Sequence, residues 1–92
     1  MNMEDIVLIA AQLCGYSFDD VVGRSKRERL SIVRQLIWRM LYQSGMSYGQ
    51  IGEMFGRSHV SVLYGVNRVK DMVSIGDRLT VELSRKVDEA VM

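Results

Sequence analysis

The sequence predicts an all-α fold, a compact bundle of about six helices in one domain that spans residues 1–92. Three observations predict it. The chain contains no proline, so nothing in it interrupts a long helix. Apolar residues recur three and four positions apart, as they do on one face of a helix. Glycine and serine residues separate these segments, as is typical of helix ends and starts.

Size and composition agree with one folded domain. Hydrophobic residues make up 48% of the chain and charged residues 25%, which is enough for a modest core. No apolar run reaches the ~18 residues that span a bilayer. The run from Ile6 to Ala11 is short and follows two acidic residues, so we do not interpret it as a signal peptide. We expect a cytoplasmic protein without a membrane partner.

The first element is expected to be a helix from Met3 to Leu13 that ends at Gly15. Ser17, with Asp20 three residues later, is typical of a capping box for a short second helix. That helix is expected to end at Gly23. The expected buried face of the first helix is Ile6, Ile9, Ala10 and Leu13.

A long central helix is expected from Lys26 to Gln43, ended by Gly45. It carries two apolar stripes, which is typical of a helix that the others surround. Trp38 and Tyr42 are interpreted as packing residues at its margin. The two stripes are Leu30, Val33, Ile37 and Leu41, and Ile32, Leu36 and Met40.

The segment at about 47–73 predicts a helix-turn-helix. Ser47 begins its first helix, and Gly56 makes the turn. Ser58 caps the second helix, which is expected to run to about Met72. The core faces of this helix and of a final helix that starts at 76–77 are expected to be Val62, Val66, Val69 and Val73, and Leu79, Leu83, Val87 and Ala90.

Charge is polarised along the chain, although the net charge is only +1. Residues 1–23 sum to −4 and residues 71–92 to −2, whereas residues 24–70 sum to +7. Local potential, rather than net charge, governs association with a polyanion. A cluster of positive charge repels itself and is often retained for a polyanion. The densest cluster precedes the central helix: Arg24, Lys26, Arg27 and Arg29.

The first turn of the second helix of the helix-turn-helix carries small and polar side chains. His59, Val60 and Ser61 face solvent there if the valines are buried, and this part of such a helix meets base edges. Its free amides suit phosphate. His59 and Ser61 can donate to bases, and Val60 can contact a thymine methyl group. A merely solvated His59 and a Ser58 that only caps the helix are the alternatives.

Other chemistries have little support in the sequence. With one histidine and one cysteine, the chain has no cluster of metal ligands. Cys14 is interpreted as a buried core thiol. Cys14 and His59 form the best catalytic pair, but no third group orients the imidazole. No phosphate-binding loop is present, so we expect no ATPase activity, no other enzyme activity and no cofactor.

Through its basic cluster and its helix-turn-helix segment, and over nearly its whole length, the chain resembles the C-terminal DNA-binding domain (domain IV) of the bacterial chromosomal replication initiator DnaA. Residues 6–27 resemble the opening helices and basic loop of that family. Arg34 and Gln35 lie in a matching V-R-Q-L-I-W-R-M-L segment, and residues 51–56 read I-G-E-M-F-G. Residues 57–62 read R-S-H-V-S-V, which resembles the family's R-D-H-[ST]-T-V.

This chain differs from the family's signature at Ser58, where the family has aspartate, and at Val60, where it has threonine. One glycine of the pair before the signature is also missing. The resemblance implies a Trp-repressor-like domain that binds a short element of double-stranded DNA. By position, residues 59–61 would meet bases or nearby phosphate in the major groove. Lys26 or Arg27 would enter the minor groove, and Arg34 would contact the DNA backbone.

The DNA-binding residues predicted are therefore Arg24, Lys26, Arg27, Arg34, Arg57, Ser58, His59, Val60 and Ser61. We expect sequence-specific binding of double-stranded DNA in replication initiation or its regulation, or in transcription control. A monomer with replication proteins as further partners is expected. The alternative is a helical protein-interaction module that keeps the fold without binding DNA.

Overall fold

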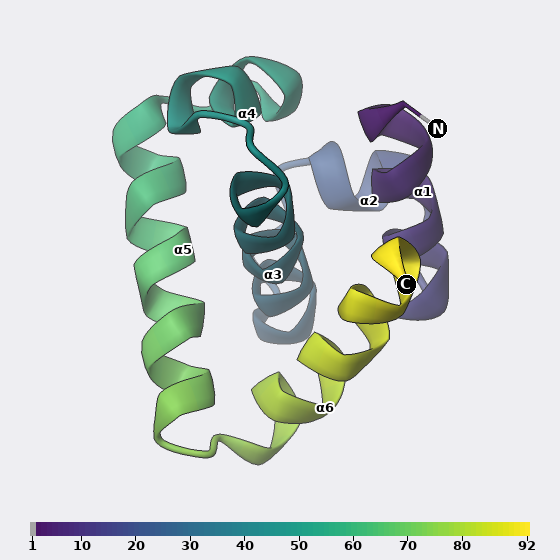
Figure 1. Ribbon diagram of the computed structural model, residues 1–92, viewed down its shortest axis with the longest axis vertical. Helices are drawn as coiled ribbons and strands as arrows, with labels where there is room; N and C mark the ends of the chain where they lie inside the picture. The colour runs from purple at the N-terminus through teal and green to yellow at the C-terminus, as the bar shows by residue number, and fades with distance from the viewer. Residues whose placement is uncertain (1) are drawn as a thin grey trace.

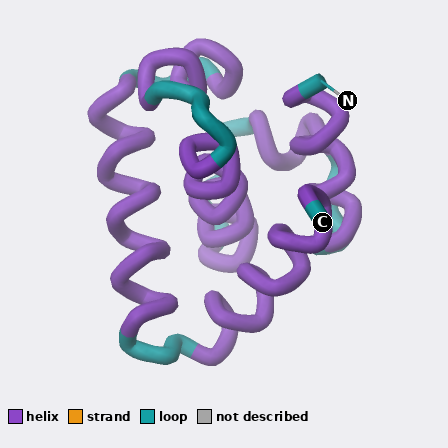
Figure 2. Tube along the Cα trace, viewed as in Figure 1, coloured by secondary structure: helices purple, strands orange, loops and turns teal. Residues whose placement is uncertain are grey.

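The computed structural model describes residues 2–92, and within them it contains helices and no strand (Figures 1 and 2). This confirms the predicted all-α class. Within the same residues, no helix is long and apolar enough to cross a membrane. The helices are α1 (Met3–Leu13), α2 (Phe18–Val22), α3 (Glu28–Gln43), α4 (Tyr48–Phe55), α5 (His59–Ser74), α6 (Arg78–Asp88) and a short 3-10 helix η1 (Glu89–Val91).

The predicted capping residues begin and end the helices. The hydroxyl of Ser17 accepts a hydrogen bond from the amide of Asp20, whose carboxylate accepts one from the amide of Ser17. Ser47 and Gln50 form the same reciprocal pair at the start of α4. Gly56 ends α4 in the left-handed region, at φ 66°, which glycine adopts without steric cost. Local side-chain chemistry therefore fixes these boundaries.

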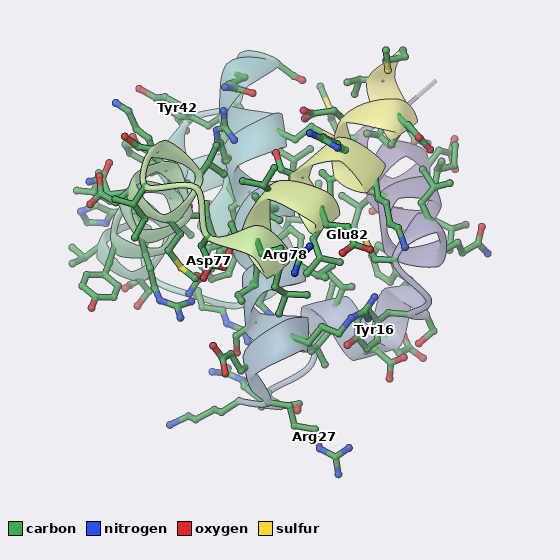
Figure 3. The ribbon with its side chains drawn as sticks, turned by 90° about the horizontal axis from the view of Figure 1, so that it is seen from below. Tyr16, Arg27, Tyr42, Asp77, Arg78 and Glu82 are labelled. Atoms are coloured by element: carbon green, nitrogen blue, oxygen red, sulfur yellow. The ribbon has the colours of Figure 1, made fainter. Side chains whose placement is uncertain are left out.

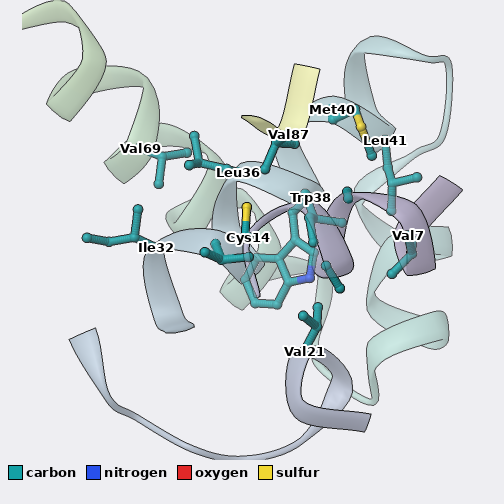
Figure 4. Close-up of a cluster of buried hydrophobic side chains, with 14 of the residues drawn as sticks. Val7, Cys14, Val21, Ile32, Leu36, Trp38, Met40, Leu41, Val69 and Val87 are labelled. Atoms are coloured by element: carbon teal, nitrogen blue, oxygen red, sulfur yellow. The ribbon is translucent and has the colours of Figure 1, made fainter. Parts of the chain in front are cut away.

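Helix α3 is the centre of the bundle (Figure 1). Helix α5 packs on one side of it, α1, α2 and α6 lie on the other, and α4 crosses near its end. Every residue of the two predicted stripes of α3 is buried, and Figure 4 shows Ile32, Leu36, Met40 and Leu41 among the buried side chains of the core. Both ends of the described chain lie on the side of α3 away from α5, where η1 packs on α1.

Helix α3 begins at Glu28 rather than at the predicted Lys26. The backbone of Arg27 is extended, with ψ 135°, and its side chain makes no capping bond. The carbonyl oxygen of Ser25 accepts a hydrogen bond from the guanidinium group of Arg34 at 3.0 Å. A side chain therefore satisfies this carbonyl, as a main-chain amide would in a helix. Residues 24–27 therefore form a loop, here called the basic loop.

The buried face of α1 differs from the prediction. Val7 and Ala11 are buried together with Ala10, whereas Leu13 is exposed and Ile6 is only half-buried. The sequence of α1 is apolar around most of its circumference, so its periodicity does not define which side faces the core.

Helix α6 buries Leu83 and Val87 as predicted, but Leu79 is exposed and Thr80 is buried in its place. The hydroxyl of Thr80 donates to the carboxylate of Asp77 at 2.6 Å, and its amide donates to the same group. Both bonds lower the pKa of Asp77 because they stabilise its charged form. A buried threonine costs little when its hydroxyl is satisfied in this way.

Helix α5 packs closely on α3 at Gly65. A Cβ atom at Gly65 would lie 2.7 Å from Cζ3 of Trp38 and 2.9 Å from Cγ of Gln35, closer than carbon atoms pack. Val62, Val66 and Val69 of α5 are buried as predicted, and Val73 is half-buried. The absence of a side chain at Gly65 therefore sets the distance between the two helices.

We predict that Gly65→Ala lowers the free energy of unfolding by about 1–3 kcal/mol, the usual cost of overpacking a core. The higher helix propensity of alanine, worth about 1 kcal/mol, opposes this loss. Gly49→Ala in α4 is the matched control, because its Cβ would meet only the hydroxyl of Ser47 at 3.9 Å. Urea unfolding measures both variants, and equal stability of the two would contradict the close packing at Gly65.

Candidate nucleic-acid interface

Two arginines join the end of α2 and the basic loop that follows it to the turn of the helix-turn-helix. Arg24 donates from Nη2 to the carbonyl oxygen of Gly56 at 3.2 Å. In the reverse direction, Arg57 donates from Nη1 to Val22 at 3.1 Å and from Nη2 to Gly23 at 2.6 Å. These bonds connect residues more than 30 positions apart in the sequence. The loop and the turn are therefore held side by side.

The structure buries Arg34, for which the sequence predicts a contact with the DNA backbone. Its side chain is only 5% exposed, so it is not placed to contact a DNA backbone. All three of its guanidinium nitrogens donate to main-chain carbonyls, to Val21 at 2.6 Å, to Ser25 at 3.0 Å and to Asp20 at 3.3 Å. Arg34 positions the basic loop from beneath, because these carbonyls lie at the end of α2 and within the loop.

The charge of these arginines is not neutralised by their hydrogen bonds, whose acceptors are neutral carbonyl groups. The pKa of Arg34 is lowered by burial and then by the charge of Arg57. The pKa of Arg57 is lowered by burial and then by the charge of Arg24. Arg34 and Arg57 nevertheless stay protonated at neutral pH, since arginine cannot be deprotonated in proteins. The result is a crowded positive surface suited to an anion.

Lys26 and Arg27 are the free cations of the loop. Both are exposed, and within residues 2–92 neither side chain makes a hydrogen bond to the protein. Arg27 extends away from the body of the molecule (Figure 3). Arg29, in contrast, donates to the carbonyl oxygen of Cys14 at 2.9 Å and lies over the ring of Tyr16. Lys26 and Arg27 can therefore move toward a ligand without breaking a bond.

Ser58 caps α5 as predicted. Its hydroxyl accepts from the amide of Ser61 at 3.2 Å and donates to the hydroxyl of Ser61 at 3.1 Å. This leaves the hydroxyl proton of Ser61 free to donate outward. His59 and Val60 are exposed in the same turn. The turn therefore presents an imidazole, an isopropyl group and a hydroxyl to solvent.

An open hollow of about 620 Å³ joins the basic loop to the first turn of α5. We call it the tip hollow. Lys26 borders it on the loop side, and the indole ring of Trp38 is part of its lining. Positive charge and the exposed end of α5 therefore share one continuous surface. The residues that line the tip hollow are Lys26, Gln35, Trp38, Arg57, Val60, Ser61 and Tyr64.

Tyr64 and Arg68 belong to this surface but were not among the predicted DNA-binding residues. Tyr64 is 71% exposed and lies one helical turn beyond Val60. Arg68 donates to the amide oxygen of Gln35 at 2.8 Å, beside the hollow. Their signal in the sequence was the helical spacing: Tyr64 follows Val60 by four residues and Arg68 follows Tyr64 by four, which places all three on one side of a helix.

The remaining chemical expectations concern cysteine and metal ligands. Cys14 is buried, which confirms the predicted core thiol. Burial raises its pKa, against the opposing charges of Arg29 and Lys86, so the unreactive thiol form is favoured. Within residues 2–92, no three residues of the types His, Cys, Asp and Glu are grouped to hold a metal ion.

Helix α4, the turn at Gly56 and helix α5, with a basic loop held beside the turn, define a helix-turn-helix domain of the nucleic-acid-binding class. The chain belongs to the family described as the bacterial dnaA protein helix-turn-helix, whose sequence profile matches residues 3–69.

Relatives of this chain are chromosomal replication initiator proteins DnaA. The protein of Picosynechococcus sp. is 30% identical over 87 residues, which cover 91% of this chain and 19% of the relative. The protein of Nostoc punctiforme is 29% identical over 90 residues, which cover 96% of this chain and 19% of the relative. DnaA 1 of Chlamydia trachomatis is 32% identical over 85 residues, which cover 91% of this chain and 18% of the relative. The chain thus spans about a fifth of the length of the curated relatives that it matches.

We predict that Arg34→Lys lowers the free energy of unfolding by about 1.5–3 kcal/mol, the value of a hydrogen bond to a charged group. Lysine keeps the positive charge but lacks the planar fork that reaches several carbonyls. Arg27→Lys in the same segment is the control and should leave stability unchanged. Thermal and urea unfolding measure both. If Arg34→Lys is as stable as the parent chain, the anchoring role assigned to Arg34 is wrong.

Proposed function

We propose that this chain binds double-stranded DNA in a sequence-specific manner through α5 and the basic loop. The observation that carries the proposal is the tip hollow, where Lys26 of the loop and Val60 and Ser61 of α5 line one surface. A single duplex can therefore contact phosphate with the loop and base edges with the helix. Membership in the DnaA helix-turn-helix family supports the same function.

The first turn of α5 is proposed to read base edges in the major groove, which is wide enough to admit a helix. His59 and the free hydroxyl proton of Ser61 supply donors, and Val60 supplies an apolar group for a thymine methyl. The amino end of α5 adds main-chain amides and partial positive charge toward phosphate. Ser58 contributes by fixing this turn through its cap.

The basic loop is proposed to bind the sugar-phosphate backbone or the adjacent minor groove through Lys26 and Arg27. Arg24 is exposed while it donates to Gly56, so it can also approach phosphate. Arg57 contributes positive potential from its half-buried position at the turn. Arg34 is proposed to hold the basic loop in place through its bonds to main-chain carbonyls, rather than to contact DNA itself.

We place this binding in replication initiation or its regulation, because the relatives are named chromosomal replication initiator proteins. Transcription control is a further role that the same DNA-binding activity would serve. The domain is proposed to act in the cytoplasm as a monomer without ATPase activity of its own, and replication proteins are proposed partners. Its target is proposed to differ from the family's element, because Ser58 and Val60 replace residues of the family signature.

The double variant Lys26→Ala/Arg27→Ala should weaken binding to all duplexes alike. Each lost phosphate contact reduces the slope of log K against log salt by about 0.9, so the slope should fall by about one to two. Arg78→Ala/Arg85→Ala on α6 removes the same charge from side chains that line a different hollow and should leave the slope unchanged. Fluorescence anisotropy at several salt concentrations gives the slopes. Equal slopes in both double variants would rule out phosphate binding by the loop.

His59→Ala should reduce discrimination between a selected duplex and a random one, by about 1–3 kcal/mol if His59 contacts a base. Affinity for the random duplex should stay nearly constant, because phosphate contacts supply it. The target is first obtained by selecting bound duplexes from a random pool. If the chain selects no duplex and instead retains a protein at high salt, the domain is a protein-interaction module and not a DNA reader.

A further inference from the structure

Two tyrosines form a stacked pair at the end of α3 and the start of α4. The ring centroids of Tyr42 and Tyr48 are 4.3 Å apart and the ring planes differ by 3°. Tyr42 is still 44% exposed although Tyr48 covers one of its faces. The pair therefore presents aromatic surface to solvent.

Beside this pair lies a hollow of about 190 Å³, here called the aromatic hollow. It is smaller than the ~300 Å³ at which pockets for drug-sized molecules begin, so it has room for one planar ring. Two of its residues are cationic and none is acidic. An anionic ligand with a flat ring matches this lining in both shape and charge. The lining is Arg39, Tyr42, Gln43, Tyr48, Val66, Asn67 and Lys70.

The aromatic hollow and the tip hollow lie on different sides of α5. At 3.6 residues per turn, Val66 lies about 160° and Lys70 about 120° around the helix from Tyr64. Tyr42 and Arg27 also lie at opposite edges of the molecule in Figure 3. A duplex held by the basic loop and the first turn of α5 would therefore leave the aromatic hollow open.

We propose that the aromatic hollow binds an unpaired base of single-stranded nucleic acid. The base stacks on Tyr42, and Arg39 and Lys70 contact the flanking phosphates. Stacking on aromatic rings within a positive groove is how proteins hold single strands without sequence preference. A duplex cannot use this hollow because its bases are stacked on one another, and an acidic peptide would leave the rings unused. The site goes beyond the proposed duplex binding and does not depend on it.

The experiment uses the full chain and a labelled oligo(dT) single strand of about ten nucleotides, within the site size of such proteins. The chain is first saturated with an unlabelled duplex, which covers the basic loop. Anisotropy of the labelled strand should then report binding. Tyr42→Ala should weaken this binding about fivefold or more, as expected when one stacking ring is lost, and Lys70→Ala should weaken it and reduce its salt dependence.

Tyr64→Ala is the matched control, because it removes another exposed tyrosine but from the tip hollow. It should leave single-strand affinity unchanged. Tyr42→Ala should in turn leave duplex affinity unchanged. If the chain binds no duplex, binding of the single strand is measured on the Lys26→Ala/Arg27→Ala variant, in which the basic loop cannot contribute. Failure of duplex binding and failure of the single-strand site are then separate results. The site is disproved if the strand displaces the duplex, if Tyr42→Ala has no effect, or if oligoglutamate competes as well as unlabelled strand.

Discussion

The position of the proposed DNA-binding surface depends on a guanidinium group that is buried without a carboxylate. Arg34 is held by three main-chain carbonyls from the end of α2 and the basic loop, and its charge stays uncompensated. Burying a charge is costly unless it is fully hydrogen-bonded, so the loop must keep the conformation that offers these carbonyls. Arg24 bonds the loop to the turn, and Arg57 of the turn bonds the end of α2, where the loop begins. The arginines therefore fix the loop and also supply the potential that attracts an anion.

Close packing at two glycines fixes the position of α5 beside the basic loop. Gly65 lets α5 approach Trp38 of α3, and a side chain at Gly52 would collide with the carbonyl oxygen of Arg57 in the turn. Helix α5 is thus held against α3 along one side and against α4 at its start. A surface that is ordered before it meets its ligand loses less entropy on binding. The rigid parts carry the flexible side chains of Lys26 and Arg27, which are free to adapt.

The sequence predicted the fold class, the caps and the spine correctly because these depend on local signals. Ser17, Ser47 and Ser58 cap helices through residues three positions away, and both stripes of α3 are long enough to define its buried faces. The buried side of α1, and the burial of Thr80 rather than Leu79 on α6, depend on contacts with other helices. The burial of Arg34 against main-chain carbonyls could not be predicted, because a phosphate-binding arginine and one that binds carbonyls look identical in a sequence. The site itself depends on tertiary bonds over more than 30 residues.

Both ends of the described chain lie on the side of α3 away from α5 (Figure 1). A fluorophore, an immobilisation tether or a second folded unit joined at either end would therefore project from the rear of α5 without covering its outer surface. The short 3-10 helix also packs against α1, so the two attachment points are mechanically coupled. Tension applied between them would first load the contact between α1 and η1.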